Sequence, residues 1–272
     1  MIATVVSLPS MLWSRASAAA LLFGLAQVEA GGPGVDLALV LAVDVSSSMT
    51  ETEQRAQRDG YIKAFRSPEL RAAIGSGARG RIAVAYLEWA GPDHRRALIP
   101  WRIVDGPAAA AFAAELERHP LVAGKGTSIS GGLAAAANLL VSVEVPADRW
   151  VVDLSGDGPN NAGGDLVPVR DRLVASGIVI NGLAISMRRT GPAEAGNAFG
   201  PGYVEAYFDS CVVGGPGAFV ISVLKAEDFT DAIMRKLVLE IAGLPSRPML
   251  ATYHPARRSA FDCGTFGKMP GR

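Results

Sequence analysis

Residues 37–48 read LALVLAVDVSSS, and this stretch decides which fold the rest of the chain can adopt. Its first seven residues are all apolar and carry no charge, which is typical of a strand buried on both faces. Asp44, Ser46 and Ser48 follow at the point where the strand should end. Their side-chain oxygens can converge only if the chain turns back on itself, so the stretch predicts a central strand followed by a polar loop.

A helix is predicted to begin directly after this loop. Glu53 lies three residues after Thr50, which is the spacing of a capping box. Hard oxygen donors on a loop between a strand and a helix are suited to a small divalent cation. This loop alone is equally compatible with a second interpretation, in which its polar residues only cap the helix.

Strand-like and helix-like segments alternate along the rest of the chain. Further strands are predicted at 81–89, 96–104, 149–154, 178–185 and 218–223. Helices are predicted at 52–66, 107–118, 129–141, 165–176 and 227–242. The turn between the first two of these further strands is so short that they must form an antiparallel hairpin. The pattern predicts an α/β fold: a doubly wound, mostly parallel six-stranded sheet with one antiparallel edge strand and helices on both faces.

Two glycine-containing segments resemble nucleotide-binding motifs but stand in the wrong context. Residues 75–80, GSGARG, match GxGxxG, yet they follow a predicted helix and precede a strand, the reverse of a dinucleotide-binding fingerprint. Residues 124–127, GKGT, lack the upstream glycine and the preceding strand of a phosphate-binding loop. Both segments are therefore interpreted as ordinary loops.

The composition argues against several classes of function. Lys+Arg and Asp+Glu both number 26, so no global charge favours binding to nucleic acid or to an anionic membrane. Three histidines and two cysteines leave little material for a zinc site or a serine-histidine triad. No segment after the N-terminal region is long and apolar enough to span a membrane.

The N-terminal region predicts export. Residues 16–26, ASAAALLFGLA, form an uncharged stretch of signal-peptide length, and small residues before Gly31 permit cleavage after Ala30. Residues 1–30 are therefore interpreted as a signal peptide, with Met11 as a more typical start, and the mature protein as periplasmic or secreted. The alternative is a disordered or buried N-terminal helix. Pairing of Cys211 with Cys263 as one disulfide is a hypothesis that depends on export.

Polar side chains follow several predicted strands at one edge of the sheet. Asp44, Ser46 and Ser48 follow the first strand, and Asp157 follows the strand at 149–154. Thr127 opens the helix just before that strand, so its loop can reach the same edge. In open α/β sheets, ligands bind at the carboxyl ends of the parallel strands. Three loops that supply carboxylate and hydroxyl oxygens to one edge predict a shared site.

These residues resemble the metal-ion-dependent adhesion site of von Willebrand factor type A (VWA) domains. The resemblance rests on DVSSS at 44–48, on Thr127 and on SGDG at 155–158, and it covers about residues 35–243. This VWA-like domain at 35–243 contains a Gly/Pro-rich insert at 188–217, and an irregular C-terminal tail follows at 244–272. Three further motifs are similar to a group of exported bacterial members of unknown function, which brings no activity with it. These motifs are EWAG at 88–91, SGDGPNN at 155–161 and GGPGAF at 214–219.

The resemblance implies a role for each of the five residues. Ser46 and Ser48 would contact the cation directly, and Thr127 would do so when a ligand is present. Asp44 and Asp157 would act mainly through bridging water. Mg²⁺ fits a compact oxygen site that retains water, and Ca²⁺ and Mn²⁺ are the alternative ions. The ion would keep a position for an acidic side chain of a protein partner.

Other polar residues near the site receive simpler interpretations. Asp153 lies inside a strand and is expected to be a paired structural residue. Asn160 and Asn161 would stabilise a turn or line the rim of the site. Trp89 is expected in the core, although it and Glu88 could also contact a partner. The three histidines are expected at the surface; they are His94, His119 and His254. A solvated charge pair is expected on the insert at Arg188 and Arg189.

Three functions remain open from the sequence. The first is an exported module that captures a partner carboxylate through the cation. The second is a metal-dependent hydrolase that uses the same ion to activate water, although no general base is tied to the site by a motif. The third is an ion that only stabilises the loops.

Overall fold

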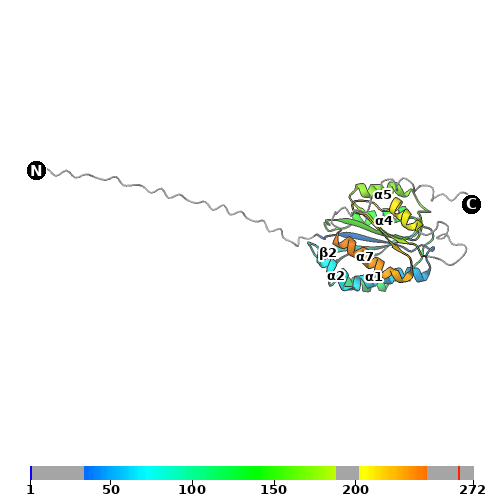
Figure 1. Cartoon of the computed structure of the whole chain (residues 1–272), viewed down its shortest axis with the longest axis horizontal. Coiled ribbons are helices and arrows are strands. Elements are labelled where there is room, and N and C mark those ends of the chain that lie inside the picture. Colours follow the sequence, from blue (N-terminus) through cyan, green and yellow to red (C-terminus); the bar gives the residue numbers. More distant parts are fainter. Residues whose placement is uncertain (2–33, 188–201, 244–262, 264–272) are drawn as a thin grey trace, which may run out of the picture.

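The computed structural model describes residue 1 and residues 34–187, 202–243 and 263 (Figure 1). The predicted signal peptide, most of the tail and the first part of the Gly/Pro-rich insert lie outside these residues. Among the described residues, no helix combines the length and the apolar character that crossing a bilayer requires.

One sheet organises the described part of the chain. It contains β1 (Ala38–Asp44), β2 (Arg81–Trp89), β3 (Arg95–Asp105), β4 (Trp150–Gly156), β5 (Val179–Ile185) and β6 (Val220–Val223). The strand order is β3-β2-β1-β4-β5-β6, and only the pairing of β2 with β3 is antiparallel. The predicted six-stranded sheet and its antiparallel edge strand are therefore confirmed.

The central position of β1 follows from its composition. All seven of its residues are buried, since it pairs in parallel with β2 on one side and β4 on the other. The register places Asp44 opposite Trp89 and Ala42 opposite Leu154. Successive residues of the apolar run alternate between two hydrophobic cores, which cover both faces of β1, and its terminal aspartate lies at the carboxyl edge of the sheet.

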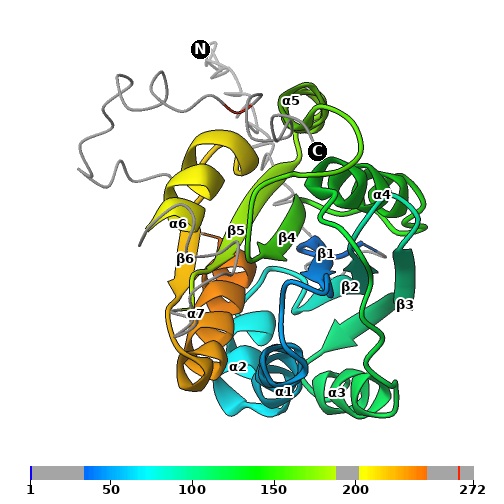
Figure 2. The ribbon, with the colours of Figure 1, turned by 90° about the vertical axis from the view of Figure 1, so that its right-hand side faces the viewer.

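Helices cover both faces of the sheet (Figure 2). One layer contains α1 (Glu51–Arg66), α2 (Pro68–Gly75), α3 (Ala109–Glu117) and α7 (Phe229–Ala242). The other contains α4 (Ile129–Val141), α5 (Leu166–Ala175) and α6 (Tyr203–Tyr207), which continues into a π-helical turn, η2 (Phe208–Val212). A 3₁₀ turn, η3 (Ala226–Asp228), precedes α7. Each layer packs its own hydrophobic core against the sheet.

The predicted capping box begins α1. The Thr50 side chain accepts a hydrogen bond from the Glu53 backbone N–H at 3.2 Å, and the Glu53 carboxylate accepts one from the Thr50 N–H at 2.6 Å. Each bond satisfies a donor that the first helical turn leaves unpaired. The helix therefore starts where the polar loop ends, as predicted.

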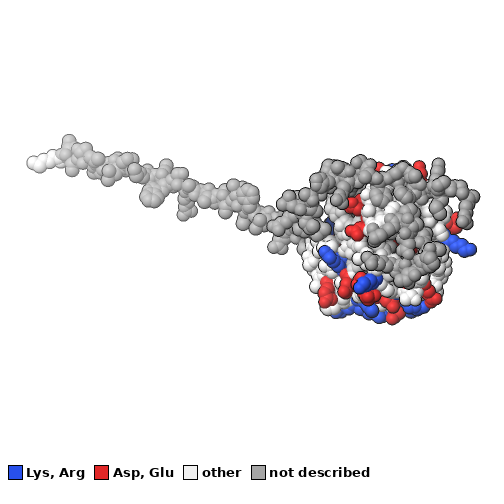
Figure 3. Space-filling view, turned by 45° about the vertical axis from the view of Figure 1, so that its right-hand side comes forward, with Lys and Arg blue, Asp and Glu red and all other residues white. Residues whose placement is uncertain are grey.

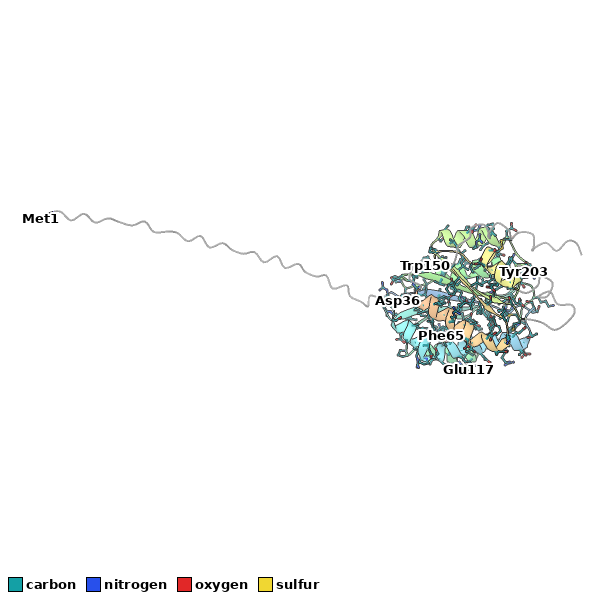
Figure 4. All side chains as sticks on the ribbon, viewed as in Figure 1. Met1, Asp36, Phe65, Glu117, Trp150 and Tyr203 are labelled. Carbon is teal, nitrogen blue, oxygen red and sulfur yellow. A yellow bond between two sulfur atoms is a disulfide. The ribbon has the colours of Figure 1, made fainter. Side chains whose placement is uncertain are left out.

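No helix was predicted within the Gly/Pro-rich insert at 188–217, and the structure differs there. Residues 203–212 form α6 and η2, because buried apolar side chains recur there at helical spacing, among them Val204, Tyr207, Phe208 and Cys211. Figure 4 places Asp36 and Trp150, near the amino ends of β1 and β4, toward one side of the molecule and Tyr203 toward the other. Segment 203–212 thus begins near the carboxyl ends of the strands.

A disulfide joins Cys211 of η2 to Cys263, as the sequence hypothesis proposed. Cys211 is fully buried, and Cys263 packs against the same hydrophobic core. The bond closes a loop with a sequence separation of 52 that includes β6 and α7. It therefore holds one residue of the C-terminal tail against the domain.

Candidate metal centre

The residues of the DVSSS loop form a continuous chain of hydrogen bonds. Asp44 Oδ1 accepts a hydrogen bond from the Ser46 N–H at 2.7 Å. The Ser46 and Ser48 hydroxyl oxygens lie 2.7 Å apart, and the Ser48 hydroxyl donates to Asp157 Oδ1 at 2.7 Å. The loop has therefore turned back on itself as predicted, and four of the five predicted residues are linked.

Strand β4 and helix α1 fix the backbone of this loop. The Asp44 N–H donates to the Ser155 hydroxyl at 3.1 Å, which ties the ends of β1 and β4 together. The buried Gln57 amide donates to the Asp44 carbonyl at 3.1 Å, and the buried Gln54 amide donates to the Ser46 carbonyl at 3.2 Å. The sequence analysis missed both glutamines. The signal that could have found them is a pair of polar side chains near the sheet-facing stripe of an amphipathic helix.

The Thr127 loop lies directly beside the DVSSS loop. The Ser47 N–H donates to the Gly124 carbonyl and the Gly124 N–H donates to the Val45 carbonyl, both at 2.8 Å. Thr127, three residues later, is 4% exposed. This short parallel bridge brings the fifth predicted residue to the same edge of the sheet.

Glycine is required where the β2–β3 hairpin approaches this loop. A Cβ atom on Gly91 would lie 2.2 Å from the Lys125 carbonyl oxygen, closer than any side chain could sit. The Ser128 N–H donates to the Ala90 carbonyl at 2.7 Å in the same region. The EWAG motif therefore provides the close backbone approach that supports the Thr127 loop.

Asn161 holds the backbone of Thr127 in both directions. Its side-chain Oδ1 accepts from the Thr127 N–H at 2.9 Å, and its own N–H donates to the Thr127 carbonyl at 2.9 Å. Asn160 Oδ1 accepts from the Ser130 N–H at 3.0 Å. The sequence left two roles open for these asparagines: to stabilise a turn or to line the rim of the site. The contacts described here are those of residues that stabilise loops.

The electrostatics of Asp44 are unusual for an aspartate. Its side chain is fully buried, and its Oδ2 atom accepts no hydrogen bond among the described residues. Burial, together with the negative charge of Asp157, raises the pKa of Asp44 from 3.8 to about 8, although hydrogen bonds from Ser46 and from the Asp157 backbone act in the opposite direction. A cation close to Asp44 would favour its charged form and so reverse this shift.

The available donors fit a hard divalent ion. In the described part of the chain, no group of three or more His, Cys, Asp or Glu side chains is placed to hold a metal. Two carboxylates and neighbouring hydroxyls are instead an all-oxygen donor set of the kind that Mg²⁺ or Ca²⁺ binds. The orphaned Asp44 Oδ2 is consistent with such an ion.

The remaining predicted residues have structural roles. Asp153 is buried and lies 2.7 Å from Lys236 Nζ, so its assignment as a paired structural residue is confirmed. Trp89 is fully buried, as predicted. Glu88 is also fully buried and forms ion pairs with Arg58 and Arg96, so the suggestion that it contacts a partner is wrong.

The expected surface positions of the histidines are corrected in part. His94 and His119 are half-buried rather than exposed, because each lies where loops pack against the domain. A Cβ atom on Gly124 would lie 2.8 Å from His94 Cγ, which shows how closely His94 packs against the Thr127 loop. His254, Arg188 and Arg189 lie outside the described residues.

Solved structures with the same architecture define the class of this domain. The chain is similar to the pilus adhesin SpaC from Lactobacillus rhamnosus GG (12% identity over 78% of this chain and 31% of that one, TM-score 0.53). It is similar to proximal thread matrix protein 1 from the mussel byssus (16% identity, 78% and 47%, TM-score 0.51). It is also similar to the SpRpn10 VWA domain (13% identity, 76% and 97%, TM-score 0.51). The fold is that of a VWA domain.

The family follows from the sequence itself. A family model described as "Protein of unknown function (DUF1194)" matches residues 34–245, and the chain belongs to this family. No curated protein matches the sequence. The chain spans less than half the length of SpaC and of the byssus protein, and at these identities the likeness concerns the fold alone.

Proposed function

We propose that this protein is an exported protein-binding module that captures a partner carboxylate through a divalent cation. The cation would be held at the carboxyl edge of the sheet by Asp44, Ser46, Ser48, Thr127 and Asp157. The observation that carries the proposal is the fully buried Asp44 carboxyl group, whose Oδ2 atom has no hydrogen-bond partner within the described residues and which has a second carboxylate, Asp157, as its charged neighbour.

The state of Asp44 is costly unless a cation is nearby. A buried carboxylate normally has an ion-pair partner or hydrogen bonds to both oxygens, because leaving water without them costs several kcal/mol. Glu88, Asp153 and Glu240, which are also buried, each have an arginine or lysine partner. No lysine or arginine of the described residues forms an ion pair with Asp44. A metal ion is the cation that fits this edge.

The ligand set explains why a partner carboxylate would bind. Two carboxylates nearly neutralise a divalent ion, while hydroxyl ligands add no charge, so the ion stays electrophilic. Mg²⁺ commonly keeps water in part of its octahedral shell, and an acidic side chain can replace that water. Ser48 is exposed, so a partner has access to this part of the site. Among the similar solved structures, SpaC is a pilus adhesin, which fits a protein-binding role.

Export is supported by two features. Residues 16–26 have the composition of a signal peptide, and the Cys211–Cys263 disulfide is of the kind that persists in oxidising compartments. Both acidic and basic side chains are visible on the part of the face in Figure 3 that belongs to described residues. We therefore propose a periplasmic or secreted location, with the mature protein starting near Gly31.

The first experiment measures divalent-ion binding. Isothermal titration of the metal-free protein with Mg²⁺ should give a saturable signal that Asp44→Ala abolishes. Asp93→Ala is the matched control, since Asp93 is exposed on the β2–β3 hairpin, and it should bind as the wild type does. Unchanged Mg²⁺ binding by Asp44→Ala would overturn the proposed site.

The second experiment separates the three functions. The protein is used to capture partners from the exported fraction, with Mg²⁺ or with a chelator. A binding module recovers one partner only with Mg²⁺, and Asp44→Ala loses the partner while keeping its fold. A hydrolase would lose turnover instead, and a purely structural ion would cost only stability.

A further inference from the structure

Segment 203–212, which comprises α6 and η2, packs beneath the loops of the candidate metal centre. Phe208 is fully buried, and a Cβ atom on Gly156 would lie 3.1 Å from its Cζ atom. Because Gly156 directly precedes Asp157, the Phe208 ring limits where the backbone of that loop can lie. The segment thus contacts one of the three loops directly.

Tyr207 connects the same segment to a second loop. Its side chain is 1% exposed, and its hydroxyl accepts a hydrogen bond from the Asn160 backbone N–H at 3.2 Å. Asn160 in turn accepts from the Ser130 N–H, and its neighbour Asn161 binds the backbone of Thr127 on both sides. Contacts therefore run without a break from Tyr207 to Thr127.

The far end of segment 203–212 is fixed to the domain. Arg170 Nη1 of α5 donates to the carbonyls of Ser210 and Cys211, both at 3.1 Å. Cys211 also forms the disulfide with Cys263. A covalent bond and an arginine hold this end of the segment, and they provide a rigid base for the hydroxyl of Tyr207, four residues before Cys211.

We propose that Tyr207 and Asn161 are positioning residues, through which segment 203–212 holds the Thr127 loop in the geometry needed to bind the cation. This inference rests on the proposed metal site, and it assigns a role to part of the insert that the fold alone does not require. Neither residue needs to contact the ion. Outer-shell partners of this kind commonly change metal affinity by about 10- to 100-fold when they are removed.

The first test does not depend on metal. Hydrogen exchange of the Thr127 and Ser130 amides is measured in the metal-free protein, because both amides donate to the two asparagines. Tyr207→Phe removes the hydroxyl and should speed this exchange by about threefold to tenfold, the loss expected for one neutral hydrogen bond. Tyr61→Phe is the control, since Tyr61 is a fully buried tyrosine packed in the core on the opposite face of the sheet. Tyr61→Phe should leave the exchange rates of the Thr127 and Ser130 amides unchanged.

The second test measures Mg²⁺ affinity well below the unfolding temperature. Asn161→Ala should weaken binding by about tenfold, because the Thr127 backbone loses its side-chain partner. Asn138→Ala, an exposed asparagine on α4, is the control and should bind as the wild type does. Asn161 is itself exposed, so its replacement leaves the core intact.

The outcomes separate this inference from the proposed function. If the wild type binds Mg²⁺ and both Tyr207→Phe and Asn161→Ala bind equally well, the positioning role is wrong and the metal site stands. If the wild type binds no divalent ion, the proposed function is wrong. Unchanged amide exchange in Tyr207→Phe would overturn the coupling between segment 203–212 and the Thr127 loop in either case.

Discussion

Two clusters of buried acidic side chains differ in where their positive charge comes from. Beneath α7, Asp153 and Glu240 both contact the ammonium group of Lys236, and all three side chains are buried. At the carboxyl edge of the sheet, Asp44 is equally buried and has the Asp157 carboxylate as a charged neighbour. The first cluster contains its own cation, whereas Asp44 has no ion pair with a described lysine or arginine.

The pKa of the raised carboxyl group is similar in the two clusters, but the interactions that oppose the rise differ. Burial, reinforced by Asp153, raises the pKa of Glu240 from 4.5 to about 8, and Lys236 opposes this rise. Burial, reinforced by Asp157, raises the pKa of Asp44 to about 8, and only hydrogen bonds oppose it. The comparison teaches that a lysine can supply a fixed charge under a helix. At the edge of the sheet, where Ser48 is exposed, the proposed divalent ion would enter from solvent and supply an exchangeable positive charge.

The largest effect is expected when the internal cation is removed. Lys236→Met should lower the free energy of unfolding by about 3–5 kcal/mol, because it leaves two buried carboxyl groups without their shared partner. Urea denaturation measures the change. Lys225→Met, at an exposed position, should stay within about 0.5 kcal/mol of wild type. An equal effect of the two variants would contradict the role given to Lys236.

The next largest effect on the free energy of unfolding is expected when Mg²⁺ is added and binds at the edge of the sheet. Mg²⁺ at 100 times its dissociation constant should raise the unfolding free energy by about 2.7 kcal/mol through ligand linkage. Asp44→Asn should lose this gain. Without metal it should be about 1–2 kcal/mol more stable than wild type at neutral pH, since the buried ionisable group is gone. Thermal unfolding with Mg²⁺ or chelator tests both statements, and equal Mg²⁺ stabilisation of the variant would refute them.

A pH dependence of stability follows from Glu240. Because its pKa is raised from 4.5 to about 8, the folded state holds a proton that the unfolded state releases in this range. Stability from this group is complete below pH 4.5 and falls as the pH rises toward 8, by at most about 1.4 kcal/mol per pH unit. Metal-free unfolding in an Asp44→Asn background isolates the effect. Glu240→Gln should flatten this slope, and an unchanged slope would show that another group titrates.

The smallest effect is expected at a third acidic residue, Glu88, which has two cationic partners. Arg58 is 6% exposed and Arg96 is 44% exposed at the side chain. Arg96→Ala should therefore cost less than about 1 kcal/mol, because solvent screens its contribution and Arg58 still compensates Glu88. Arg58→Ala should cost several times more. The reverse order in chemical denaturation would show that burial does not decide which partner matters.

Much of the fold could be predicted from local patterns. The apolar run of β1, the capping box at Thr50 and the short turn between β2 and β3 each constrain a few neighbouring residues, and each prediction is confirmed. The carboxyl-edge rule then predicted that the DVSSS, Thr127 and Asp157 loops would meet. The hydrogen bonds from Ser48 to Asp157 and from Ser47 to Gly124 agree with that prediction.

Other features could not be predicted because they depend on residues that are distant in the sequence. Gln57 binds the Asp44 carbonyl, and the Asn160 backbone binds the Tyr207 hydroxyl, contacts that no local periodicity reveals. The helix at 203–207 was hidden because glycine and proline flank a short apolar segment, which packs against β5 and β6.

Periodicity and spacing in the sequence were enough to predict the order of the elements and the hairpin at the sheet edge. They also predicted that five oxygen-bearing residues lie at one edge of the sheet. Only the tertiary structure decided which buried acids have a partner. Lys236 reaches Asp153 from α7, more than 80 residues away in the chain. Asp44 sits at the edge of the sheet, and no described lysine or arginine pairs with it. Burial and charge compensation are properties of the packed molecule, and they distinguish Asp44 as a buried carboxyl group without an ion-pair partner among the described residues.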